Sequence, residues 1–251
     1  EFGSENDFFH GLWSHFKEVV KHRARFVFYY KDVFMNYNYS DPLSLLKSVQ
    51  HSILKFDLIT ELNQNTILYR CRQHEKPTEI KDNIDMASAP IQYCKQNGRM
   101  NPAGIAMFYC SRTRDLTVKE VVNKSDKLKP YYSTVIFRNK EPLRLVDLTK
   151  LPGIGSIFDK EKNVDIDIIL FLEGFLEDIS KPVKNDDTTL EYVPTQIITE
   201  YIRFNPKLNV DGIIYPSSKI KEAKNIVLFL NHEESLNQLN FSQRSIKTFK
   251  I

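Results

Sequence analysis

The stretch 97–122 constrains the fold of this chain most strongly, because turn, strand and helix signals follow one another within it. It opens on Asn97-Gly98, a dipeptide that breaks regular structure. Residues 105–110 then form an apolar run of strand length, and residues 116–122 follow with the pattern of a helix, preceded by several N-cap candidates. A short strand followed directly by a helix favours a mixed α and β domain.

The rest of the chain repeats these two patterns. Alternating or β-branched runs predict strands over 66–71, 133–137, 143–148 and 225–230, and the sequence VDGIIYPSS is typical of a strand followed by a turn. Helical periodicity predicts helices over 6–30, from Asp41-Pro42 to about residue 53, and over 192–204, whereas 166–176 fits a helix or a buried strand. Residues 74–96 are expected as a loop with a short helix around 84–95, and the polar tail from Asn231 as an edge element. Many short strands with interspersed helices predict an α+β fold.

The N-terminal part predicts a helical segment ahead of the main domain. Residues 1–4 have the look of a cloning scar and are excluded from the fold, so that the natural start is hidden. Residues 5–64 are expected to form the helical segment and residues 65–251 the main domain. Each expected helix has one apolar face, which must be buried against another surface. We expect docking on the main domain, with docking on a second copy of the chain, and hence a homodimer, as the alternative.

Composition narrows the class of protein. A net charge of +3 on 251 residues is too dilute to indicate direct nucleic-acid binding, and the lysines are scattered along the sequence. The three cysteines contain no C-x-x-C pair, which favours a reducing, cytoplasmic compartment over a disulfide framework or a zinc site. The histidines show no metal-ligand spacing, and no apolar run approaches the ~20 residues of a membrane span. No metal, membrane or signal peptide is therefore expected.

Three polar residues stand out along the central stretch: Arg99 before the strand, Tyr109 near its end and Glu120 in the helix. Each has an ordinary alternative. Arg99 fits a solvated loop residue, and Tyr109 fits a core tyrosine with its hydroxyl at the surface. Glu120 fits a capping box with Thr117, because T-x-x-E is that signature.

A pair of arginines on the first strand of the main domain adds a fourth candidate. Arg70 and Arg72 are two residues apart and therefore project from the same face of that strand. A guanidinium directed inward needs an anionic partner. A protein carboxylate is the commoner partner, and a bound phosphate is the alternative.

Taken in order, these residues belong to a set of motifs that resembles one family. The motifs are Leu68-Tyr69-Arg70, Gly98-Arg99-x-Asn101-Pro102-x-Gly104, Phe108-Tyr109, Thr117-x-x-Glu120-Val121 and Asp211-Gly212-Ile213-Ile214-Tyr215-Pro216-Ser217-Ser218. Their order and spacing, from about Tyr69 to Phe229, resemble the RES-domain proteins, named for an arginine, a glutamate and a serine. The N-terminal segment is similar to a helical region related to HEPN domains that precedes some RES domains. The HEPN ribonuclease motif R-x4-6-H is absent from residues 6–62, so no nuclease activity is assigned to it.

The resemblance implies a fold and an activity. RES domains are similar in fold to ADP-ribosyltransferases, whose split β-sheet clamps nicotinamide adenine dinucleotide (NAD+). Family members degrade NAD+ at the nicotinamide–ribose bond by hydrolysis or phosphorolysis, with water or inorganic phosphate as the acceptor. They need NAD+ as substrate and no further cofactor or metal. They usually act as growth-arresting toxins paired with a cognate antitoxin, although the extra N-terminal helices also fit a stand-alone or phage-defence enzyme.

Residue roles follow from the same resemblance. Glu120 is the expected carboxylate beside the ribose, where it stabilises an oxocarbenium-like state. Arg99 and Arg70 are expected at the pyrophosphate, which suits the bidentate guanidinium, and Tyr109 is expected to stack on the nicotinamide.

The site serine is expected at Ser217, as a binding hydroxyl, with Ser218 as the rival position. A nucleophilic serine would need a histidine base, and none is paired with it in the sequence. Two other functions remain open: an ADP-ribosyltransferase that modifies a macromolecule, and a regulatory module that binds a nucleotide without turnover. The retained Glu120 speaks against the second, because a carboxylate near phosphates weakens binding.

Overall fold

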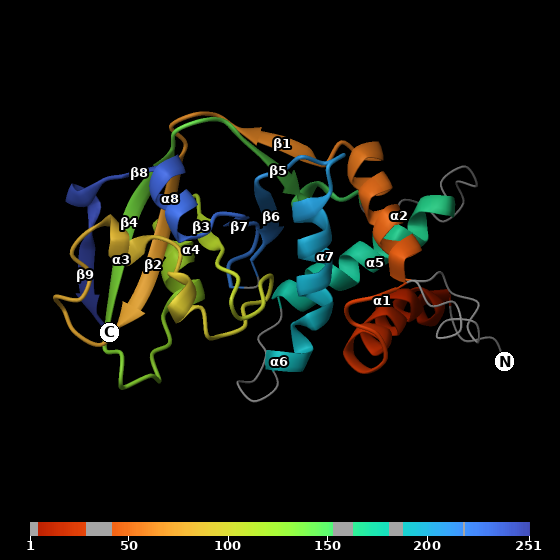
Figure 1. The fold of residues 1–251 in the computed structure, drawn as a ribbon, viewed down its shortest axis with the longest axis horizontal. Helices are drawn as coiled ribbons and strands as arrows, with labels where there is room; N and C mark the ends of the chain where they lie inside the picture. Colours follow the sequence, from red (N-terminus) through yellow and green to blue (C-terminus); the bar gives the residue numbers. More distant parts are fainter. Residues whose placement is uncertain (1–4, 29–41, 153–162, 181–187, 218) are drawn as a thin grey trace. The chain divides into compact units, whose positions relative to one another are not determined.

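The computed structural model describes residues 5–28, 42–152, 163–180, 188–217 and 219–251 (Figure 1). The chain divides into two compact units, each built from three separate stretches. The helical unit comprises Glu1–Ile59, Gln96–Pro102 and Lys150–Asn209, and the sheet unit comprises Thr60–Lys95, Ala103–Thr149 and Val210–Ile251. The boundary predicted after residue 64, between the helical segment and the main domain, stays a prediction.

The helical unit contains five described helices. They are α1 (Glu5–His22), α2 (Pro42–Lys55), α5 (Asn163–Ser180), α6 (Thr188–Glu191) and α7 (Val193–Phe204). The predicted helix at Pro42 is confirmed, with the proline in the first turn where its missing N–H costs nothing. Residues 166–176 belong to a helix rather than a strand, because they lie inside α5.

An aromatic cluster joins the first helix to the fifth. The Trp13 ring lies 5.3 Å from that of Phe171 and 6.2 Å from that of Phe175, both edge to face, and Phe16 packs against Phe171 at 5.5 Å. Trp13 Nε1 donates to Asp178 Oδ2 at 2.8 Å, so that the buried indole keeps a hydrogen bond. Helices α1 and α2 thus pack on α5 and α7, as expected for a helical cap with one apolar face per helix.

The first helix ends earlier than predicted. The prediction extended it over 6–30 with Phe26 on the buried face, but α1 stops at His22 and Phe26 is 89% exposed. The guanidinium of Arg25 donates to Val20 O at 3.2 Å and to Lys21 O at 2.9 Å. These two bonds satisfy carbonyls of the last turn, which is how a basic side chain ends a helix. Tyr30, the last residue of the predicted face, lies outside the described residues.

Nine described strands form one mixed sheet in the second unit. They are β1 (Ile59–Leu62), β2 (Ile67–His74), β3 (Phe108–Ser111), β4 (Tyr131–Asn139), β5 (Leu143–Asp147), β6 (Gly212–Pro216), β7 (Lys224–Leu228), β8 (Leu239–Phe241) and β9 (Lys247–Lys250). Their order is β1-β5-β6-β7-β3-β2-β4-β8, with β9 also paired to β4. β5 and β6 run parallel, whereas the pairs from β6 through to β9 are antiparallel. The α+β class predicted from the sequence is confirmed.

The sheet is weakly joined at one seam. β2 pairs with β4 along its whole length, from Ile67↔Arg138 to His74↔Tyr131. In contrast, β2 and β3 share a single register pair, Tyr69↔Ser111. The two halves of the sheet therefore diverge on either side of this pair, as in a split sheet.

Short helices complete the sheet unit and pack against its strands (Figure 1). They are α3 (Asn83–Met86), α4 (Arg114–Val121) and α8 (His232–Gln238), with 3-10 turns at η2 (Ile91–Tyr93), η3 (Leu148–Lys150) and η6 (Gln243–Ser245). α4 packs against β2, β3 and β4. The predicted strand at 105–110 begins later, at Phe108, and the polar tail supplies the edge strands β8 and β9. No described helix has the length and apolarity that a bilayer crossing requires.

Candidate functional site

Glu120 lies at the centre of a hydrogen-bonded cluster in the sheet unit. Ser217 Oγ donates to Glu120 Oε1 at 2.6 Å, and Asn225 Nδ2 donates to the same oxygen at 3.0 Å. Glu120 comes from α4, Ser217 from the turn after β6 and Asn225 from β7, so that Glu120 is about a hundred residues from the other two in sequence. The structure therefore brings together the two residues predicted from the motifs, Glu120 and Ser217, and adds a third.

The Ser217 hydroxyl is oriented by its own turn. Ser217 N donates to Ala223 O at 2.9 Å, which closes the turn between β6 and β7. Lys219 N and Ile220 N lie 3.0 Å and 3.3 Å from Ser217 Oγ and donate to it. Because the oxygen accepts these two bonds, its proton is directed to Glu120. Ser218, the rival position, lies outside the described residues.

Asn225 is the site residue that the sequence analysis missed. It is 8% exposed and lies opposite Ser111 on β3 and Tyr215 on β6. The sequence did contain a signal, since an asparagine opens the otherwise apolar run 225–230. A buried side-chain amide requires a hydrogen-bond partner, but only the fold shows that the partner is Glu120.

The capping-box alternative for Glu120 is wrong. Thr117 lies inside α4, and its Oγ1 donates to Arg114 O at 2.7 Å. The N-cap is Thr113, whose side chain makes no capping bond. Glu120 lies in the last turn of α4, where a carboxylate has no backbone N–H to cap, and it accepts from Ser217 and Asn225 instead.

Arg70 bonds to main-chain carbonyls rather than to a carboxylate. Its Nη1 donates to Tyr109 O at 3.1 Å and its Nη2 to Ala87 O at 3.3 Å. The guanidinium carbon lies 4.4 Å from the centre of the Phe108 ring, and Nε is buried without a partner among the described residues. Burial, followed by the nearby charge of Arg72, lowers the pKa of Arg70 to about 9, so the side chain remains charged at neutral pH.

Strand alternation places Arg70 on the opposite face of the sheet from Tyr109 and Asn225. The pair Tyr69↔Ser111 aligns the odd-numbered residues of β2 and β3 on one face, and Tyr109↔Val227 and Ser111↔Asn225 extend that face to β7. The side chain of Arg70 belongs to the other face, with Phe108. Arg70 therefore joins β2 to β3 at the seam, and its role at a phosphate stays a prediction.

Tyr109 is half-buried on the same face of the sheet as Asn225, and its carbonyl is fixed by the bond from Arg70. Its side chain is thus separate from the core that Phe108 and Cys110 enter on the other face. Contact of its ring with a nicotinamide stays a prediction.

Arg99 belongs to the helical unit, not to the unit that contains Glu120. Its Nη1 donates to Ile179 O at 2.5 Å, near the C-terminus of α5, where the helix dipole favours a cation. Thr195 Oγ1 donates to Arg99 O at 2.5 Å and Gln196 Nε2 to Gly98 O at 2.9 Å. Arg99 is therefore part of a loop bonded to α5 and α7, and it is not simply a solvated loop residue.

The described part of the chain contains no candidate metal site, because no three of its His, Cys, Asp or Glu side chains are grouped to hold an ion. The absence of a cofactor other than the substrate stays a prediction.

Comparison with known families agrees with the motifs. Residues 67–244 match the family described as RES domain. The matched region runs from β2 into the last 3-10 turn and includes all the site residues named above. No curated protein sequence matches the chain. Since the match covers well over half of its length, the chain belongs to the RES domain family.

Proposed function

We propose that this protein is an enzyme that degrades NAD+ by cleaving the bond between nicotinamide and ribose. The proposal rests on the family, whose members are known as NAD+-degrading toxins, and on the carboxylate of Glu120. One oxygen of that carboxylate is held by two neutral donors, Ser217 and Asn225. Among the described residues no Lys, Arg or His forms an ion pair with Glu120, so that none of these residues neutralises its negative charge.

This arrangement suits the chemistry of the bond. Loss of neutral nicotinamide leaves positive charge on the ribose, and a fixed carboxylate beside the sugar stabilises that charge as it develops. Oε1 is occupied by Ser217 and Asn225, and the described residues leave Oε2 without a hydrogen bond. Oε2 is thereby available to accept a bond from a ribose hydroxyl.

The remaining roles are part of the same proposal. From the family resemblance alone, Tyr109 is assigned to the nicotinamide ring, and Arg99 and Arg70 are assigned to the pyrophosphate, although Arg70 lies on the opposite face of the sheet from Tyr109. Ser217 binds through its hydroxyl and does not attack the substrate, because its proton is directed to a carboxylate and no histidine lies in its described contacts. Water or inorganic phosphate accepts the ADP-ribosyl group. Growth arrest, with or without a cognate antitoxin, follows from the family resemblance, and a cytoplasmic location follows from the pattern of the three cysteines.

The direct test is release of free nicotinamide from NAD+ by the purified protein. The second product identifies the acceptor: ADP-ribose indicates water, a phosphorylated ADP-ribose indicates phosphate, and ADP-ribose bound to an added macromolecule indicates transfer. If NAD+ binds but no nicotinamide is released, with or without phosphate, the protein is a binding module and the proposal is overturned.

Glu120→Gln is the matched variant, because it keeps the shape of the side chain and removes the charge. Turnover is expected to fall by roughly 100-fold or more, as for other preorganised electrostatic groups, whereas NAD+ binding persists. Nicotinamide release gives the first quantity and calorimetry the second. Full activity in this variant would remove Glu120 from the mechanism.

A further inference from the structure

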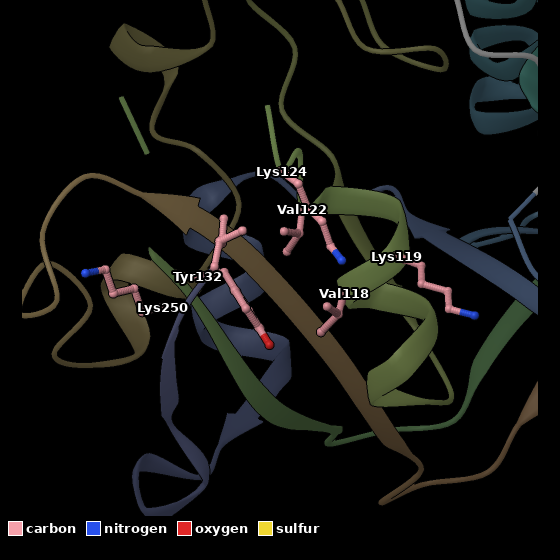
Figure 2. Close-up of a pocket in the computed structure, with 7 residues that line it drawn as sticks. Val118, Lys119, Val122, Lys124, Tyr132 and Lys250 are labelled. Carbon is pink, nitrogen blue, oxygen red and sulfur yellow. The ribbon is translucent and has the colours of Figure 1, made fainter. Parts of the chain in front are cut away.

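A hollow of about 580 Å3 opens beside the C-terminal half of α4 (Figure 2). It lies in the sheet unit and is lined by Val118, Lys119, Val122, Lys124, Tyr132, Lys250 and Ile251. This volume falls within the range of roughly 300–1,000 Å3 that is typical of small-molecule sites. Glu120 is not among the lining residues, because it bonds to Ser217 and Asn225. The hollow is therefore distinct from the proposed active site, although both border α4.

The lining is strongly cationic. It contains three lysines, Lys119, Lys124 and Lys250, against one anionic group, the terminal carboxylate of Ile251. None of their ammonium groups forms an ion pair or a hydrogen bond with a described residue. Lys119 and Lys124 are close in the sequence, in α4 and just after it, whereas Lys250 borders the same hollow because β9 pairs with the start of β4, where Tyr131 lies opposite Lys250. An excess of positive charge attracts anions.

The interior of the hollow is apolar and aromatic. Figure 2 shows Tyr132 and the two valines between Lys119 on one side and Lys250 on the other. The Tyr132 ring is stacked on Phe249, with 5.1 Å between the ring centres and 19° between the planes, which fixes its orientation. An oriented aromatic ring is a surface on which a planar ligand can stack.

The walls are held in place before any ligand binds. The side chain of Gln73 on β2 donates to Asn123 O at 3.0 Å and to Lys129 O at 2.8 Å, and it accepts from Asn123 N at 2.7 Å. These bonds anchor both ends of the loop that contains Lys124. A preorganised site binds more tightly because less conformational entropy is lost on association.

We propose that this hollow is a second ligand site, for a mononucleotide. The phosphate would be neutralised by the lysines, and the base would stack on Tyr132. A single-stranded nucleic acid is a poorer match, because it needs several stacking platforms along a basic track, whereas this hollow offers one. A site for inorganic phosphate alone describes the hollow less well, because it would leave the Tyr132 ring without a ligand group to stack on.

The test is a titration with AMP followed by methyl NMR. Val118 and Val122 report on the hollow, and Val227, opposite Tyr109 on β7, reports on the face that carries Asn225. AMP is expected to shift the Val118 and Val122 signals saturably. Ribose 5-phosphate, which lacks only the base, is expected to bind at least about tenfold more weakly, as loss of one stacked base implies. Equal affinities would overturn a nucleotide site, and so would shifts confined to Val227.

Charge reversal supplies the matched variants. Lys124→Glu with Lys250→Glu is expected to weaken AMP binding at the two valines by tenfold or more. Lys150→Glu with Lys207→Glu makes the same change in net charge within the helical unit and is expected to leave the affinity unchanged. An equal loss in both double variants would show a non-specific charge effect and refute the site. The unliganded spectra verify that each variant is folded, and none of these results depends on turnover at Glu120.

Discussion

At the scale of single residues, the position of the Glu120 carboxylate depends on two neutral donors rather than on a cation. Ser217 and Asn225 both bond to Oε1, which fixes the direction of the other oxygen. A cation in their place would neutralise the charge that the proposed reaction uses. The burial of Asn225 adds rigidity, since its backbone is paired on both sides within the sheet.

Asn225→Ala tests this positioning role. A hydrogen bond to a charged group contributes about 1.5–3 kcal/mol, so we expect kcat for nicotinamide release to fall by roughly 10- to 100-fold. KM should change little, because the variant removes no proposed contact with NAD+. Asn139→Ala is the control: Asn139 is also buried in the sheet unit, and its Nδ2 donates to Asn63 O and Glu141 O.

The control should lower the melting temperature and leave kcat of the folded protein unchanged. If Asn225→Ala also lost only stability, with kcat intact, the amide would be a structural residue and not a positioning one.

At the scale of elements, two glycines mark places where backbone and side chains approach closely. A Cβ on Gly212 would lie 2.2 Å from Val227 O, in the pairing of β6 with β7. A Cβ on Gly174 in α5 would lie 2.6 Å from Trp13 Cδ1 in α1. Neither neighbour can move aside easily, because one is main chain within a sheet and the other is a buried ring.

Alanine substitutions should therefore rank by what the new methyl group meets. We expect Gly212→Ala to be the most destabilising and Gly174→Ala to follow, each by at least the 1–3 kcal/mol that is typical of overpacking. Gly104→Ala is the comparison, because its Cβ would meet nothing within 4 Å and only the φ of +88° is unfavourable. Urea unfolding of the three variants gives the ranking, and a Gly212 variant as stable as the Gly104 variant would contradict the close approach of β6 and β7.

The helix α4 borders both proposed sites. One side presents Glu120 to the turn after β6, and Val118 and Val122 line the hollow beside β4. This division is possible because α4 lies across β2, β3 and β4, between β7 and the edge of the sheet.

At the scale of the whole molecule, the N-terminal helices cover apolar surface that belongs to the family-matched region. Trp13 and Phe16 of α1 pack on Phe171 and Phe175 of α5, and α5 and α7 lie within residues 67–244. Each apolar side chain that is fully buried stabilises the folded state by roughly 1.5–3 kcal/mol, so this contact is comparable to the net stability of a domain.

A chain that starts at Asn65 should therefore be poorly soluble or unfolded, because it would expose Phe171 and Phe175 to water. Sedimentation and circular dichroism measure both properties. A milder variant, Phe16→Ala, removes one ring of the cluster and should cost about 3–5 kcal/mol by the same argument. A truncated chain with an unchanged melting temperature and full nicotinamide release would refute a structural role for the helices. Increased activity in a folded truncated chain would instead identify them as a gate.

The sequence by itself determined the type of most helices and strands, and it contained the motifs of the family. Local periodicity predicted the strand at β2, the helix at α7 and the helix start at Pro42, because apolar spacing reports directly which face of an element is buried. The ordered motifs identified Glu120 and Ser217 and assigned the family, since chemical identity and spacing are properties of the sequence alone.

Only the tertiary structure decided which side chains meet. The bonds from Ser217 and Asn225 to Glu120 cross about a hundred residues of sequence, and the register of β2 against β3 decided that Arg70 faces away from Asn225. Lys250 borders the same hollow as Lys119 and Lys124 only through the pairing of β9 with β4. Strand order, register and helix docking arise from contacts between remote segments, and a shift of one residue in register reverses every side chain of a strand, so no local pattern contains this information.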